Sequence, residues 1–131
     1  MSSFGFDKDF IIQEYGYDDD VPEEVRSQIE SETGEELVDE DYEYVADGAI
    51  AWWRAEDGDV DDLADLFLDM KANLADDDAV CWLFVPGPSS EGHVSAHEIK
   101  EAAVTAGLQS SSSIAASGWS GVRLLSSHAR R

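Results

Sequence analysis

The sequence predicts an α/β domain with a mostly parallel sheet, flanking helices and a closing antiparallel hairpin. Short apolar runs typical of buried strands alternate along the chain with segments of helical periodicity. This alternation favours parallel strands joined by right-handed crossovers. The last two strand-like runs, 108–116 and 119–127, meet at Ser117 and Gly118 and therefore predict a hairpin.

The first strand and helix are predicted on either side of a glycine and three aspartates. The strand is expected at 9–15, where three apolar residues stand together. The helix is expected at 22–33, because apolar residues recur there every four positions. Asp20 is placed to cap this helix, Pro22 suits its first turn, and Gly34 is suited to end it.

The next segment is ambiguous until a second strand begins. Leu37 and Val38 are compatible with a short strand, and 42–45 with a helical turn or an irregular stretch. The run 48–55 is continuous and apolar, which is expected of a strand with both faces covered.

The second half of the chain carries the clearest helix. Residues 59–78 combine an apolar stripe with aspartates at the start, where the helix dipole favours negative charge. A buried strand is expected at 79–86. The helix 95–107 is expected to begin with a capping box formed by Ser95 and Glu98.

Length and composition indicate one cytoplasmic domain. The 131 residues, 43% of them apolar, fit a single domain over 1–131, with 1–7 and 127–131 expected to be loose ends. No apolar run approaches the roughly 20 residues of a membrane helix, and the first residues lack the pattern of a signal peptide. Cys81 stands in the most apolar run, so a buried, inert thiol is expected rather than a redox sensor.

Charge is distributed unevenly along the chain. The formal net charge is −22, but residues 1–80 hold 27 of the 30 acids and four of the eight bases, a net of −23. Residues 81–131 carry a net of +1. This asymmetry predicts an acidic face that repels nucleic acid and attracts proteins with a basic surface.

The junction between the first strand and helix, "EYGYDDDVPEE", argues against a phosphate ligand. A nucleotide loop needs several glycines and a free helix N-terminus, whereas this loop has one glycine and several acids. Asp18, Asp19 and Asp20 with Glu23 are also oxygen donors suited to Mg²⁺ or Ca²⁺. Capping and solvated charge explain them as well, so no cofactor or metal is assigned.

Hydrolytic and histidine-based chemistry finds little support. No G-x-S-x-G elbow exists, and the run of serines at 110–113 lies in an expected strand. His93 and His97 are four positions apart, but a third metal ligand is missing. No catalytic residue is assigned.

Several stretches resemble one bacterial family. They are "QEYGYDDDV", "TGEELVDEDY", "WWRAEDGDVDDL", "AGLQSSSSIAASGWSGVRLL" and the closing "ARR". Together they resemble the actinobacterial branch of the domain of unknown function numbered three thousand and fifty-two, from about Phe6 to Arg131. The resemblance implies a reduced Rossmann-like fold, similar to a methyltransferase scaffold without its cofactor motif. It carries no established site residues. Genes of this branch often lie near those for the first component of pyruvate dehydrogenase and a peroxiredoxin, which implies a possible partner.

The leading hypothesis is a non-enzymatic, acidic protein-interaction or regulatory module. The candidate contact patch comprises Tyr17, Asp18, Asp19, Asp20 and Trp119. The alternative is a small-molecule binder or weak enzyme that uses the carboxyl ends of the strands. A nucleic-acid mimic is a minor alternative. The hairpin leaves a sheet edge that a second copy could pair with, so a homodimer is compatible with the sequence.

Overall fold

The computed structural model describes residues 4–75 and 79–126. Its elements, in chain order, are β1 (Ile12–Tyr15), α1 (Glu23–Thr33), β2 (Gly48–Trp52), the 3-10 turn η1 (Ala55–Asp57), α2 (Val60–Ala72), β3 (Cys81–Pro86), α3 (Ala96–Thr105), β4 (Leu108–Ala116) and β5 (Trp119–Ser126). The sheet order is β1-β2-β3-β5-β4. Strands β1, β2 and β3 are parallel, and β5 runs antiparallel to both β3 and β4. The predicted mostly parallel sheet and closing hairpin are therefore confirmed.

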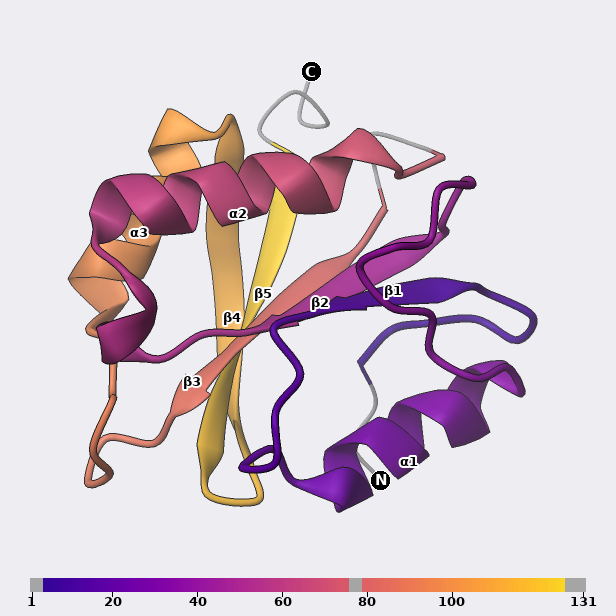
Figure 1. Ribbon diagram of the computed structural model, residues 1–131, viewed down its shortest axis with the longest axis horizontal. Helices are drawn as coiled ribbons and strands as arrows, with labels where there is room; N and C mark the ends of the chain where they lie inside the picture. The colour runs from indigo at the N-terminus through magenta and orange to yellow at the C-terminus, as the bar shows by residue number, and fades with distance from the viewer. Residues whose placement is uncertain (1–3, 76–78, 127–131) are drawn as a thin grey trace.

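The sheet separates two apolar layers. Helix α1 lies against one face, while α2 and α3 cover the other (Figure 1). Along β3 the side chains alternate between the layers, with Leu83 packed toward α2 and α3 and Trp82 and Phe84 toward the α1 side. Burial on both faces explains why this strand reads as an unbroken apolar run.

Local signals fix the helix ends. Asp59 caps α2 by accepting the N–H of Asp62, whose carboxylate accepts the N–H of Asp59 in return. Ser95 caps α3 by accepting the N–H of Glu98. Gly34 ends α1 in the left-handed conformation, with a φ of 77°. The Gly34 end of α1 and the Ser95 cap of α3 agree with the sequence pattern, but only the Ser95 half of the expected capping box is seen in the described structure.

Several expectations about element ends and caps are wrong, and the first concerns β1, which begins at Ile12 instead of residue 9. Strand β2 ends at Trp52 instead of continuing to residue 55, because the chain turns into η1 and sends Arg54 back toward β1. Asp20 makes no cap for α1, since its carboxylate pairs with Arg54. Helix α2 ends at Ala72, six residues before the expected 78; residues 76–78 lie outside the described part.

The N-terminal segment is partly in the core. Phe4 and Phe6 are buried against the α1-side layer, although 1–7 was expected to be loose. The ring of Phe4 meets Trp82 edge-on, and its backbone carbonyl accepts the indole N–H of that residue at 2.7 Å. Residues 1–3 and the expected loose end 127–131 lie outside the described residues.

The outer edge of β1 carries one extra contact. Val38 forms a single parallel bridge with Gln13 and exchanges backbone hydrogen bonds with Ile12 and Glu14. The short strand that was compatible with Leu37 and Val38 is thus reduced to one bridge. Over residues 4–75 and 79–126, no helix has the length and apolar character needed to cross a bilayer.

Candidate functional site

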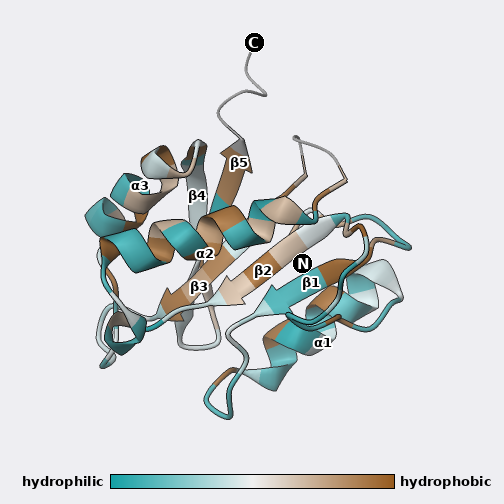
Figure 2. Cartoon of the chain, turned by 45° about the horizontal axis from the view of Figure 1, so that its top comes forward, coloured by the Kyte–Doolittle hydropathy of each residue, from teal (hydrophilic) through white to brown (hydrophobic). Residues whose placement is uncertain are grey.

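The middle of strand β1 is polar in sequence but buried in the fold. Figure 2 shows its end in hydrophilic colour between apolar strands and helix α1. Gln13 and Glu14 are only 1% and 5% exposed. A buried amide and a buried carboxylate cost free energy unless they are hydrogen-bonded. Their hydrogen-bond partners therefore identify the segments that β1 holds in place.

Glu14 holds helix α1 and strand β2 together. Its carboxylate accepts two hydrogen bonds from the Arg26 guanidinium and one from the Trp52 indole, each at 2.8 Å. Arg26 also pairs with Glu23 at 3.1 Å. The hydrogen bonds with Glu14 raise the pKa of Arg26, so this cation is permanently charged and already neutralised.

Gln13 and Asn73 fix the loop that follows α1. The Gln13 amide donates to the carbonyls of Asp39 and Tyr42, both at 3.0 Å. The Asn73 amide donates to the Tyr42 carbonyl at 2.9 Å and to the Gln13 side-chain oxygen at 3.1 Å. A loop rich in acids is therefore anchored from beneath by two amides, which reduces the conformational entropy it would lose on binding.

Gly16 connects the β1–α1 loop to the acidic loop that follows α1. Its N–H donates to the Glu40 carboxylate at 2.7 Å. Its φ is +77°, and a Cβ built there would lie 2.3 Å from the carbonyl oxygen of Trp52. A glycine is thus required here by close packing against β2, independently of any ligand.

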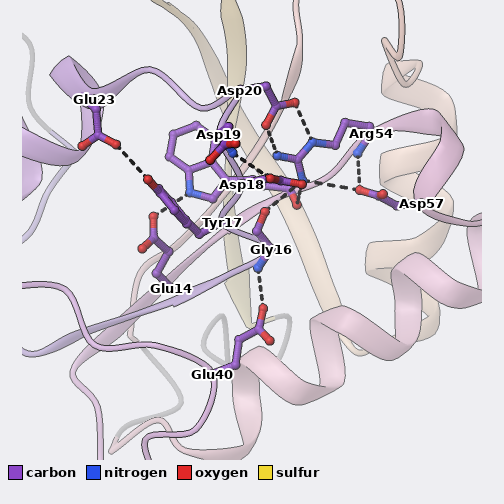
Figure 3. Close-up of polar contacts among 11 residues, drawn as sticks. Glu14, Gly16, Tyr17, Asp18, Asp19, Asp20, Glu23, Glu40, Arg54 and Asp57 are labelled. Atoms are coloured by element: carbon purple, nitrogen blue, oxygen red, sulfur yellow. Dashed lines mark hydrogen bonds and ion pairs between the residues drawn. The ribbon is translucent and has the colours of Figure 1, made fainter.

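Arg54 fills the position between the carboxyl ends of β1 and β2. Its guanidinium donates to the Gly16 carbonyl at 2.9 Å, to the Trp52 carbonyl at 3.3 Å and to both carboxylate oxygens of Asp20 (Figure 3). Helices α1 and α2 leave these two strands toward opposite faces, so this is the topological switch point of the sheet. The chain's own ion pair occupies it.

Tyr17 projects from the same loop into solvent. It is 50% exposed, its hydroxyl donates to Glu23 at 3.2 Å, and the Arg26 guanidinium lies 4.5 Å from its ring centroid. The hydrogen bond to Glu23 raises the pKa of Tyr17. An exposed ring held in place by a hydrogen bond and a cation–π contact is suited to recognition.

An open groove of about 540 Å³ runs beside Tyr17. We define the groove by its eight lining residues: Glu14, Tyr17, Arg26, Leu37, Val38, Asp39, Asp41 and Tyr42. Its size falls within the range of roughly 300–1,000 Å³ seen for small-ligand sites. A smaller cavity of about 100 Å³ lies at the starts of α2 and α3, beside Asp59 and Glu98.

The structure divides the sequence-predicted patch. Tyr17, Asp18 and Asp19 are exposed on the β1–α1 loop, whereas Asp20 turns to Arg54. Trp119 is 9% exposed and meets the Trp52 ring edge-on, so it belongs to the core rather than to an accessible contact surface. The Arg54 guanidinium lies 5.3 Å from the Trp119 ring centroid, which places Trp119 behind the ion pair.

The residues considered for metal binding or catalysis do not converge in the described structure. Across residues 4–75 and 79–126, no three His, Cys, Asp or Glu side chains are grouped to hold a metal ion. His93 bonds the Pro86 carbonyl from a loop, while His97 is exposed on α3. Cys81 is buried as expected, and burial raises the pKa of its thiol to about 12.

Sequence reasoning missed the residues that organise this site. Arg54, Glu14 and Gln13 were assigned no role, yet each carried a signal. Polar residues 13 and 14 interrupt an apolar strand, and Arg54 is one of four bases among 27 acids in residues 1–80. A polar side chain within a buried element must find a partner, and here the partners lie in distant loops.

The fold is that of methyltransferases. An O-methyltransferase of neocarzinostatin biosynthesis (NcsB1) superposes with a TM-score of 0.55 at 15% identity, covering 78% of this chain and 36% of its own. Magnesium protoporphyrin IX methyltransferase from Synechocystis PCC 6803 gives 0.53 at 8% identity, covering 91% and 71%. The ribosomal protein L11 methylase of Lactobacillus delbrueckii gives 0.53 at 14%, covering 92% and 72%. At these identities the likeness concerns the fold alone.

Closer relatives are mycobacterial. The uncharacterized proteins Rv2239c of Mycobacterium tuberculosis (strain ATCC 25618 / H37Rv) and Mb2263c of Mycobacterium bovis are each 42% identical over 126 residues, covering 96% of this chain and 77% of their own. They support the resemblance to an actinobacterial family of unknown function. The family model described as "Protein of unknown function (DUF3052)" matches residues 1–128, and this chain therefore belongs to the DUF3052 family.

Proposed function

We propose that this protein is a non-enzymatic module that binds proteins with a basic surface. The observation that carries the proposal is a fixed acidic surface beside the exposed Tyr17. We call this surface the acidic rim and define it by five exposed residues: Asp18, Asp19, Glu40, Asp41 and Glu43. Hydrogen bonds from Gln13, Asn73 and Gly16 hold its two loops in one arrangement.

Basic side chains of the described residues do not neutralise the acidic rim. Among the residues the structure describes, none of the five carboxylates of the rim forms an ion pair with a basic side chain. Unpaired negative charge on one surface accelerates encounter with a basic partner and makes binding sensitive to salt. The gene context implied by the family resemblance makes the first component of pyruvate dehydrogenase one candidate partner.

The alternative of a small-molecule enzyme is less well supported. S-adenosylmethionine is bound in the Synechocystis methyltransferase and in the NcsB1 structure. The residues of this chain do not fit such a cofactor at the switch point, because the Arg54 guanidinium and Asp20 occupy it. The β1–α1 loop also offers aspartates where a nucleotide loop supplies glycines. No step is therefore assigned to that cofactor.

Charge reversal on the acidic rim tests the proposal. The purified, tagged protein is used to capture partners from a native lysate at low and high salt, and each captured protein is then purified and its affinity measured. Asp18→Lys with Asp19→Lys should abolish binding without unfolding. Asp65→Lys with Asp69→Lys, on exposed positions of α2 beyond its first turn, is the control with the same change in charge.

Two results would contradict the proposal. One is the absence of any reproducible partner at either salt concentration. The other is equal loss of binding in the rim variant and the α2 control, which would mean that net charge alone attracts the partner. Thermal shifts with S-adenosylmethionine and adenine nucleotides test the enzyme alternative on the same samples, because a ligand that binds the native state raises its melting temperature.

A further inference from the structure

The groove contains charged groups that the fold leaves without counter-ions. Asp39 and Asp41 line it, and neither forms an ion pair with any basic side chain described by the structure. Within the described part of the chain, the Asp39 carboxylate accepts the N–H of Asp41 at 3.0 Å. The cation that lines the groove, Arg26, is already shared between Glu14 and Glu23. The groove thus has an excess of negative charge.

The other walls of the groove suit an aliphatic chain that ends in a cation. Leu37 and Val38 supply apolar surface, and Tyr17 and Tyr42 supply aromatic rings. Lysine and arginine bury their methylene groups on apolar surface while their charged ends reach polar groups. Aromatic faces attract the same cations, as the Arg26 guanidinium already does 4.5 Å from the centroid of the Tyr17 ring. The combination of aliphatic, aromatic and carboxylate groups in one groove therefore matches a basic side chain.

We propose that the groove docks an extended segment of a partner protein and takes up one of its lysine or arginine side chains between Tyr17 and Asp41. This inference rests on the proposed function and specifies where and how the partner is held. The groove is open to solvent rather than enclosed, so a segment of another protein can reach it. Its loop is fixed in advance by Gln13 and Asn73, so docking loses little entropy on this side.

The test measures binding of a short fluorescein-labelled peptide in which lysine alternates with glycine. Anisotropy titrations use the full chain at about 50 mM and about 300 mM salt, because screening separates general attraction from close contact. Asp39→Asn with Asp41→Asn removes the two carboxylate charges of the groove that lack a counter-ion among the described residues, and it retains the shape and the Asx hydrogen bond. The control, Asp65→Asn with Glu101→Gln, removes the same charge from α2 and α3.

A second pair of variants separates the groove from the general acidity of the protein. Tyr17→Ala removes a ring that lines the groove, whereas Tyr44→Ala removes a more exposed ring, 75% accessible, that does not line it. We expect about a tenfold loss of affinity for the groove double variant and for Tyr17→Ala, equivalent to about 1.4 kcal/mol. The two controls should change affinity less than about twofold. A groove variant that binds like its control overturns the inference.

The possible failures are distinguishable. If the peptide binds the original protein and every variant equally, the docking inference is wrong while the acidic interaction module stands. If neither the peptide nor any captured partner binds the original protein, both are wrong. If spermine displaces the peptide at equal concentration and depends on the same groove residues, the occupant is a small polyamine, and the proposed protein segment is wrong.

Discussion

Arg54 and Asp20, 34 positions apart in sequence, form a two-point ion pair between the carboxyl ends of β1 and β2. The partners differ in environment: the Arg54 side chain is 9% exposed and that of Asp20 53%. Arg54 additionally donates to the carbonyls of Gly16 and Trp52. In this pair, Arg54 is a buried donor that bonds several acceptors, whereas the Asp20 carboxylate is also accessible to water.

Removing the two partners should have unequal effects on stability. Arg54→Met keeps much of the apolar stem but leaves the Gly16 and Trp52 carbonyls without their side-chain donor, so a loss of about 2 to 3 kcal/mol is expected. Asp20→Asn leaves those bonds intact and should cost about 1 kcal/mol or less. Urea denaturation followed by tryptophan fluorescence measures both. Equal losses of unfolding free energy in the two variants would mean that the ion pair stabilises the protein more than the hydrogen bonds to the two backbone carbonyls do.

The same pair predicts a pH dependence. The hydrogen bond with Arg54 lowers the pKa of Asp20 below the ordinary value of an aspartate. A carboxyl whose pKa is lower in the folded state contributes stability above its unfolded pKa, and loses that contribution as pH falls through the folded value. The difference in unfolding free energy between the original protein and Asp20→Asn should thus be constant near neutrality and shrink below about pH 4. A difference that grows on acidification would show that the sign is wrong.

Gly16 and Gly118 provide a matched pair for the cost of a side chain at positive φ. Their φ values are +77° and +89°, but a Cβ at Gly118 would meet nothing within 4 Å. Gly118→Ala should therefore show only the backbone cost, about 1 kcal/mol. Gly16→Ala adds a clash with the Trp52 carbonyl and should lose at least about 3 kcal/mol, or fail to fold. Similar losses of unfolding free energy in the two variants would show that β1 and β2 move apart easily to make room for the added methyl group.

The sequence predicts elements well where the signal is local. Strand β3 is apolar on both faces, and α2 combines periodicity with aspartates at its start, so the presence of both elements follows from a few neighbouring residues, although the end of α2 does not. The hairpin follows from Ser117 and Gly118, whose φ values are 53° and 89°. Each of these features is decided by side chains within one or two turns of chain.

The sequence does not predict which residues meet over long distances in the chain. Asp20 could cap α1 or pair with a guanidinium. The end of β2 places Arg54 next to Asp20, and this decides for the ion pair. Trp119, flanked by small polar residues, gives no local sign of burial, yet β5 inserts between β3 and β4 and carries it against Trp52. The exposed part of the candidate patch was predictable from composition. Its organisation by Gln13 and Asn73 was not, because those partners lie 60 positions apart.

Cys81 should be unreactive while the protein is folded. Its thiol is buried and its pKa is raised to about 12, mainly by desolvation, so almost no thiolate exists near neutral pH. A disulfide reagent such as DTNB should label it only slowly in buffer at about pH 8, and at once in denaturant. Labelling should track the rate of unfolding or opening. Fast labelling of a protein with a native circular dichroism spectrum would contradict the buried position.

Gln13 and Asn73 should act on the acidic loop as one unit. Gln13→Leu removes the donor for the Asp39 carbonyl and one donor for Tyr42, and a loss of about 2 kcal/mol is expected because the strand position is buried. Asn73→Ala removes the second donor to Tyr42 and the bond to Gln13. The double variant should lose about 1 kcal/mol less than the sum of the single losses.

Backbone amides of residues 39–45 should exchange faster with deuterium in each single variant, while those of β3 change only as global stability changes. Additive losses with unchanged exchange in 39–45 would mean that the loop is held by other contacts. In that case the acidic rim would have to be ordered by the partner on binding, and its affinity would carry that entropic cost.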